Sequence, residues 1–205
     1  MDFSRAEELL DAVASIVDHP LYEDSPRFRL SATLADSSLQ FSAASRVLCA
    51  EGLLLGAGAT LRSQFEALIR SVWALHCATD SQVDRLSADL NLETQQASKN
   101  IPQVNEMLAE LEKLPLLKNL LVSLNEFKSS SWLPLNSFVH SGIHAVHWTK
   151  YGAPPQLLDT IFRASNGLSL LAFVSIGRLT GRPNVQSEIF AVSSRFASVL
   201  PKLKE

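Results

Sequence analysis

The chain has 205 residues and a net charge of −3, and hydrophobic residues make up 46% of it. This hydrophobic content predicts a packed globular core and excludes a disordered chain. The slightly acidic balance argues against broad electrostatic binding of DNA, although a local phosphate site needs only a few arginines. With 8 glycines and 9 prolines, the sequence offers few of the turns that an all-β protein needs.

Apolar residues recur at helical spacing along the N-terminal half of the chain. Helices are expected over residues 3–18, from 26 past 50, from about 59 to 79 and over 81–98. In the second of these we expect the buried residues to be Leu30, Leu34, Leu39, Phe41, Val47 and Leu48. Asp80 or Ser81 is expected to cap the fourth helix, whose polar composition places it at the surface.

The C-terminal half continues the same pattern. Shorter helices are expected over 101–114 and 115–127, a loop at 128–131, a helix after Pro134 through residue 151, a long apolar helix from 156 to 181 and a terminal helix over 184–200. Strand-like alternation never extends beyond a few residues. The sequence therefore predicts a single all-α domain over residues 1–205. It is a helical bundle of about four long helices with shorter inserted helices, with a core at 26–180 and a polar helical insertion at 81–128.

The first residues, the longest apolar run and the cysteines indicate the cellular compartment. The first residues, MDFSRAEELLDAV, are acidic and amphipathic, unlike the basic start of a signal peptide. The longest uncharged apolar run, between Arg163 and Arg178, is shorter than the ~20 residues that cross a bilayer. Cys49 and Cys77 match no zinc or redox spacing and are expected to be buried free thiols. We therefore expect a cytoplasmic protein without a membrane partner.

A charged stripe follows the third expected helix. Within GAGATLRSQFEALIRSVWALHCAT, residues 56–79, only Arg62, Glu66 and Arg70 carry charge, and they follow one another at intervals of one helical turn. Ile69 and Trp73 fall on the same side, which is unusual for a solvated face. Two interpretations stay open: an ion pair that fixes how helices pack, or an arginine, Arg62 or Arg70, that binds phosphate while Glu66 holds it.

Three of the 5 histidines fall within the stretch LNSFVHSGIHAVHW. If residues 135–151 are one helix, a single arc carries Asn136, His140, His144, His147 and Tyr151. Beside this arc, four apolar residues are expected to anchor the helix in the core: Leu135, Val139, Ile143 and Val146. Three interpretations of this arc stay open, and the first is that it is a face exposed to solvent.

The second is a metal site in which His140 and His144 share one ion, with Glu66, His76 or His147 as the third ligand. The third is an acid–base or phosphate-facing role for His140, with Asn136 orienting the substrate, because an imidazole exchanges protons near neutral pH.

The segments LNSFVHSGIHA and LRSQFEALIRSVWAL resemble the paired signature helices of HEPN-like bacterial proteins, which include families related to abortive-infection and toxin–antitoxin proteins. In these proteins an early helix carries an arginine with a glutamate one turn later. A later helix carries a polar residue followed, one turn on, by a histidine. The resemblance spans residues 30–180 and implies an all-helical fold.

In ribonuclease members of that group, an arginine steadies the phosphate and the histidine serves the chemistry of the 2′-hydroxyl, typically across a homodimer interface. The resemblance implies that Asn136 takes the polar position and His140 the histidine position. The arginine position is Leu135, which cannot bind phosphate. This departure favours a non-catalytic or differently acting member, unless the helices pack so that Arg62 or Arg70 replaces the missing arginine.

The leading interpretation is a cleft that binds a nucleotide or an RNA phosphate, with a lining of Arg62, Glu66, Asn136, His140 and His144. Further ligand-binding candidates are Arg70, His147 and Tyr151, and neither a cofactor nor a metal is part of this interpretation. The resemblance implies a defence or toxin–antitoxin context, an antitoxin-like protein partner and a homodimer. The alternatives are a metal-independent endoribonuclease, a metal-dependent hydrolase using His140 and His144, and a non-catalytic structural or partner-binding bundle.

Overall fold

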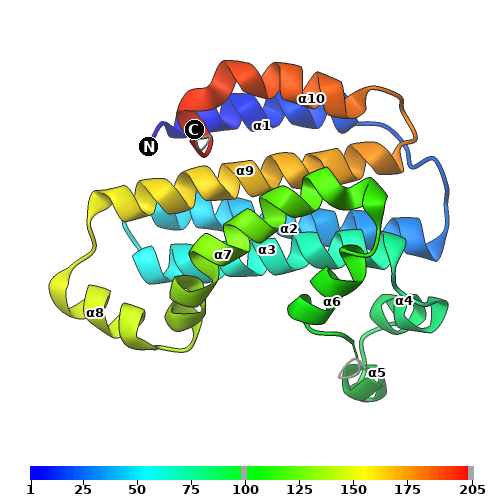
Figure 1. The fold of residues 1–205 in the computed structure, drawn as a ribbon, viewed down its shortest axis with the longest axis horizontal. Helices are drawn as coiled ribbons and strands as arrows, with labels where there is room; N and C mark the ends of the chain where they lie inside the picture. Colours follow the sequence, from blue (N-terminus) through cyan, green and yellow to red (C-terminus); the bar gives the residue numbers. More distant parts are fainter. Residues whose placement is uncertain (98–100, 203–205) are drawn as a thin grey trace.

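The structure, a computed structural model, describes residues 1–97 and 101–202, and every regular element in those ranges is helical (Figure 1). The elements are α1 Phe3–Val17, α2 Pro26–Ala50, α3 Leu54–His76, α4 Asp80–Ser87, α5 Leu92–Ala97, α6 Val104–Leu111, η2 Pro115–Leu117, α7 Lys118–Val139, α8 Ile143–Tyr151, α9 Pro155–Leu179, α10 Val185–Ser193 and η3 Ser194–Val199. The predicted all-α fold class is confirmed.

The helix starts follow from local capping. The side chain of Asp2 accepts a hydrogen bond from the backbone N–H of Arg5 and caps α1. Ser25 caps α2, and Pro26 occupies the first turn, where its missing N–H is not needed. The expectation that Asp80 or Ser81 caps the next helix was wrong, because Thr79 does so in a reciprocal capping box with Gln82.

Antiparallel α2 and α3 are joined by buried serines at intervals of seven residues. The hydroxyls of these serines donate to backbone carbonyls of α3: Ser31 to Ser71 at 3.0 Å, Ser38 to Gln64 at 2.9 Å and Ser45 to Ala57 at 3.5 Å. Each step of two turns along α2 matches two turns back along α3. Small side chains let the two backbones lie close together, and the hydrogen bonds fix their register.

The buried face of α2 therefore differs from the one expected from its large apolar residues. It consists of Leu30, Ser31, Ala35, Ser38, Ser42, Ser45 and Cys49. Of the predicted core residues only Leu30 is buried; Leu34, Leu39 and Leu48 are half-buried, while Phe41 and Val47 are exposed. The thiol of Cys49 is buried and that of Cys77 is half-buried, and both cysteines are free.

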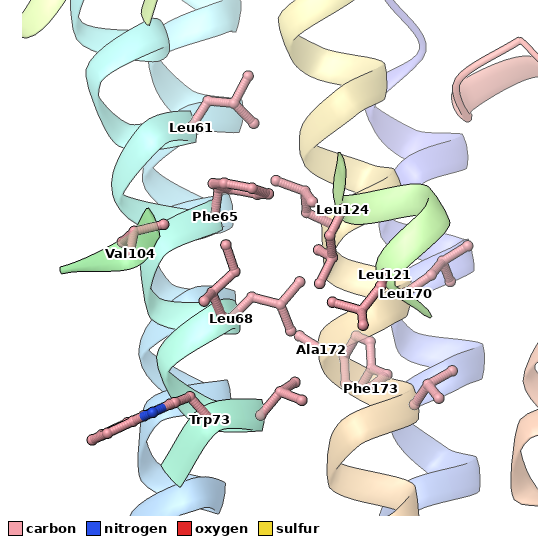
Figure 2. Packing of buried hydrophobic residues seen from close by; sticks show 14 of the residues in the cluster. Leu61, Phe65, Leu68, Trp73, Val104, Leu121, Leu124, Leu170, Ala172 and Phe173 are labelled. Carbon is pink, nitrogen blue, oxygen red and sulfur yellow. The ribbon is translucent and has the colours of Figure 1, made fainter. Parts of the chain in front are cut away.

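Helix α9 lies between two layers, with α1 and α10 on one side and α2 and α3 on the other (Figure 1). Figure 2 shows Leu61, Phe65 and Leu68 of α3 directed towards Leu121 and Leu124 of α7 and Phe173 of α9. Contrary to the estimate from its uncharged run, α9 is long and apolar enough to cross a membrane. Yet 56% of its most apolar window is buried in the bundle, as in a core helix.

Several predicted boundaries were wrong. The expected loop at 128–131 is helical, because α7 continues through it and through Pro134 to Val139. The helix expected over 81–98 is divided into α4 and α5, and residue 98 lies outside the described residues. The third helix begins at Leu54 rather than near residue 59. The segment after α5 contributes to the core, since Met107, Leu108 and Leu111 of α6 are buried.

Candidate functional site

The charged stripe on α3 contains an ion pair at one helical turn. The Nε of Arg62 donates to Oε1 of Glu66 at 2.9 Å, and the two side chains are 18% and 30% exposed. The pair thus lies at the edge of the core rather than inside it. Glu66 occupies one N–H of the guanidinium and fixes the direction in which the rest of the group faces.

The other residues on this side of α3 are enclosed, as expected from their spacing. Ile69 and Trp73 are fully buried, and the indole Nε1 of Trp73 donates to Oε2 of Glu110 on α6 at 2.6 Å. Arg70, one turn after Glu66, is half-buried, and its Nε has no hydrogen-bond partner in the described part of the chain.

The last turns of α7 pack directly on the start of α3. A β-carbon placed on Gly58 would lie 2.3 Å from Cδ2 of Phe138 and 3.4 Å from Cδ2 of Leu135. Both of these side chains are buried. Only a glycine leaves room for the ring at this position. This contact brings the end of α7 beside the turn of α3 that carries Arg62.

As a result, His140 reaches the ion pair. Its Nε2 lies 3.3 Å from Nη1 of Arg62. A guanidinium can only donate, so Nε2 of His140 is the acceptor in this hydrogen bond. The Arg62 guanidinium also lies over the ring of Trp132, 5.0 Å from the ring centroid. Of the three histidines in the segment, His140 is therefore the one that contacts the Arg62–Glu66 pair.

The expected continuous helix over 135–151 is wrong. His140 ends α7, Ser141 has a left-handed backbone with φ of 52°, and the N–H of Gly142 donates to the carbonyl of Ser137 at 2.8 Å. Gly142 is the second residue after the C-cap His140, and its bond to the Ser137 carbonyl is that of a Schellman motif. The hydroxyl of Ser137 then accepts from the backbone N–H of His144 at 2.9 Å, so α8 starts in a new direction.

The break divides the expected arc of polar residues. Asn136 and His140 belong to the end of α7, whereas His144, His147 and Tyr151 belong to α8. The ring of His147 contacts Trp148 and Tyr151, and within the described ranges no hydrogen bond or ion pair joins a side chain of α8 to Arg62 or Glu66. Asn136 is half-buried. The compact site is therefore Arg62, Glu66, Trp132 and His140, with the first three half-buried and His140 exposed.

The comparison with protein families matches residues 35–202 to a family of unknown function, DUF6988. The chain belongs to this family. The matched range includes all of the residues that meet at the Arg62–His140 contact. No curated protein and no solved structure matches the chain.

The apolar residues expected to anchor the histidine segment of this DUF6988 protein behave differently from the prediction. Leu135 is buried, but Val139, Ile143 and Val146 are exposed. Their helical spacing was read on one continuous helix. The left-handed Ser141 turns α8 so that Ala145 is its buried residue instead.

The same break removes the i, i+4 spacing on one helix that the metal interpretation requires of His140 and His144. Across residues 1–97 and 101–202, no group of three or more His, Cys, Asp or Glu side chains is arranged so that it could hold a metal ion. His76, considered as a third ligand, lies elsewhere, in a small pocket at the ends of α3 and α9 that Arg178 also lines. Burial lowers the pKa of His76, and the positive charge of Arg178 lowers it further.

The predicted site residues of the DUF6988 chain did not include Trp132, Gly58 or Phe138. For Trp132 a signal exists, because Trp132, Asn136 and His140 follow one another at intervals of one turn on α7. Gly58 and Phe138 carry no such signal. Their importance depends on two helices meeting at one point, which no local pattern describes.

Proposed function

We propose that this DUF6988 protein binds the phosphate of a nucleotide or of RNA at the surface where Arg62 meets His140. The observation that supports the proposal is the 3.3 Å contact between Nη1 of Arg62 and Nε2 of His140. A guanidinium forms strong, charge-assisted hydrogen bonds to phosphate oxygens, and a neighbouring imidazole adds a group that can donate or accept a proton.

The arrangement of Arg62 leaves donors for a ligand. A guanidinium has five N–H groups, of which one is directed to Glu66 and one to His140. The remaining three have no partner among the described residues. The Trp132 ring supports the cationic plane from one side. A phosphate would therefore meet an arginine whose orientation is already set, which lowers the entropic cost of binding.

The resemblance to HEPN-like proteins extends this proposal to RNA, a homodimer and a defence or toxin–antitoxin setting. It also gives the second candidate function, a metal-independent endoribonuclease. In that reaction Nη1 of Arg62 releases Nε2 of His140 and turns to the phosphate, and Nε2 then takes the proton of a 2′-hydroxyl while that oxygen attacks phosphorus. The bond from phosphorus to the 5′-oxygen breaks, and that oxygen takes a proton from water. Arg62 would stabilise the charge on the phosphoryl oxygens.

The observation that favours this second candidate is that Arg62 contacts His140, so an arginine lies beside this histidine although Leu135 cannot supply one. Leu135 occupies the arginine position of the resemblance and is buried. Arg62 reaches the histidine from a different helix, 78 residues away in the chain. It can therefore supply the phosphate contact without an arginine on α7.

Binding can be tested with a fluorescein-labelled single-stranded RNA and with a labelled adenosine nucleotide, measured by fluorescence anisotropy. Arg62→Gln and His140→Gln are each expected to weaken binding by roughly tenfold or more, the loss of about one charge-assisted hydrogen bond. The matched control is Arg163→Gln, because Arg163 forms a similar half-buried pair with Asp159 on α9. Equal binding by all four proteins, or no binding by wild type, would contradict the proposal.

Cleavage is tested on the same RNA in the presence of EDTA. Cleavage that His140→Gln abolishes while binding persists would support the endoribonuclease, and the absence of cleavage would leave binding alone. If Arg62→Gln and His140→Gln change only the melting temperature and no ligand binds, the contact serves to hold α7 on α3, which is the structural alternative.

A further inference from the structure

Helix α8 carries its apolar residues on the outside. Ile143 is 81% exposed, Val146 59% and Tyr151 66%, and His147 and Lys150 are exposed with them. These residues follow the spacing i, i+3, i+4, i+7 and i+8, which is the spacing of a helix face that packs against another helix. No helix among the described residues covers that face.

Among the described residues, the exposed face of α8 takes no part in core packing. Of its nine residues only Ala145 is buried, and the helix packs on the end of α7. In Figure 1, α8 lies at one end of the molecule, away from the layers that surround α9. A helix with so little burial gains no core stability from three large exposed apolar side chains.

The charges around α8 indicate what its partner carries. Between Glu126 and Asp159 the sequence contains no acidic residue, while it carries Lys128 and Lys150 together with three histidines. The chain as a whole has a net charge of −3. The exposed face of α8, which carries Lys150 and no carboxylate, complements a partner that presents carboxylates.

We propose that the exposed face of α8 docks an acidic amphipathic helix of another protein. The partner's apolar stripe would cover Ile143, Val146 and Tyr151, and its Asp or Glu residues would pair with Lys150 and, when protonated, with His147. The aliphatic side chains favour a protein over a nucleic acid, whose bases stack on aromatic rings. Two lysines are few for an anionic membrane surface. A second copy would bring two acid-free faces together without a carboxylate between them.

The test selects partners from a displayed library of random helical peptides, using the full-length protein as bait. Peptides are expected to share an apolar stripe flanked by Asp or Glu, and one is resynthesised with a fluorescent label. Ile143→Asp is expected to weaken its binding by at least roughly tenfold, the usual loss at a central anchor residue. Leu116→Asp, an exposed apolar residue on η2, is the matched control and should bind as wild type does.

A charge-reversal experiment distinguishes specific recognition from nonspecific hydrophobic binding. Lys150→Glu should weaken the acidic peptide, and a peptide with Lys in place of its Glu should regain affinity for that variant. All of the replaced side chains are exposed, so each variant should keep the wild-type circular dichroism spectrum and melting temperature. A library that yields no peptide sensitive to Ile143→Asp, or only basic peptides, would overturn the proposal. So would a dimer, a vesicle interaction or an RNA complex that Ile143→Asp abolishes.

Discussion

Gly58 and Phe138 fit together so closely that the aromatic ring occupies the space where any other residue would place its β-carbon. Gly58 lies one turn before Arg62 on α3, and Phe138 lies two residues before His140 at the end of α7. The contact therefore sets the distance between the two groups of the candidate site. The site depends on a steric fit made by two residues that have no chemical function of their own.

Gly58→Ala is expected to destabilise the protein by about 1–3 kcal/mol, the usual cost of forcing extra volume into a packed contact. The variant should also lose phosphate binding, because the end of α7 must move away from Arg62. Thermal unfolding and RNA anisotropy measure the two effects. Adding Phe138→Leu should restore stability in part.

Gly56→Ala serves as the control, because its β-carbon would meet the flexible side chain of Leu48 at 3.2 Å. If Gly58→Ala proves as stable as Gly56→Ala, the close fit of Phe138 does not position α7.

Glu66→Gln is expected to cost about 1 kcal/mol or less, rather than the several kcal/mol of a fully buried pair. The reason is that Arg62 and Glu66 retain 18% and 30% exposure, so water screens part of the charge. A double-mutant cycle of Arg62→Gln and Glu66→Gln in urea denaturation gives the coupling energy. A coupling of several kcal/mol would mean that the pair is more enclosed than its exposure indicates.

Ser141→Gly is expected to stabilise the protein by about 0.5–1 kcal/mol, because a residue with a β-carbon is disfavoured at φ of 52° and glycine is not. Ser141→Val should have the opposite effect, since a β-branched side chain tolerates this conformation least. Both substitutions are measured by chemical denaturation. A destabilising Ser141→Gly would show that the serine side chain contributes more than its backbone conformation costs.

Ser38→Leu is expected to destabilise the protein by about 1–3 kcal/mol or more. The reason is that this fully buried side chain lies between α2 and α3, where a larger one would force the helices apart. Ser38→Ala removes only the hydrogen bond to the Gln64 carbonyl and should cost about 1 kcal/mol. Ser37→Leu, one position away and bonded within its own helix, should change stability by less than about 0.5 kcal/mol. Comparable values at the two positions would contradict the proposed register.

His76 is expected to make stability fall at mildly acidic pH. Its pKa in the folded protein is lowered below the ordinary value of 6.5, first by burial and then by Arg178. Below that ordinary value the unfolded chain takes up the proton before the folded protein does. The contribution of His76 is therefore present above pH 6.5 and is lost as the pH falls through its lowered pKa.

The measurement is the free energy of unfolding between neutral and mildly acidic pH, and His76→Gln should flatten its slope. His19→Gln, at an exposed histidine, should keep the wild-type slope. Identical slopes for His76→Gln and wild type would remove His76 as the cause.

The helical nature of the chain followed from periodicity, because one apolar face per helix suffices to specify it. The ranges of α1 and α2 were close to those expected, since Pro20 and Pro26 mark their ends and starts locally. The buried face of α2 was not predictable by the same means. Large apolar residues normally mark the core, but on α2 the serines are inside, because only small side chains allow α3 to approach.

For the candidate site, too, some features followed from the sequence and others only from the tertiary structure. The sequence by itself determined which groups carry charge and that Arg62 and Glu66 share a helix face, because one turn of helix is a local property. Tertiary structure decided that His140 joins them, that α8 turns away at Ser141 and that the apolar stripe of α8 faces outward. The meeting of His140 with Arg62 depends on where Phe138 contacts Gly58, and a contact between distant segments is set by packing rather than by local propensity.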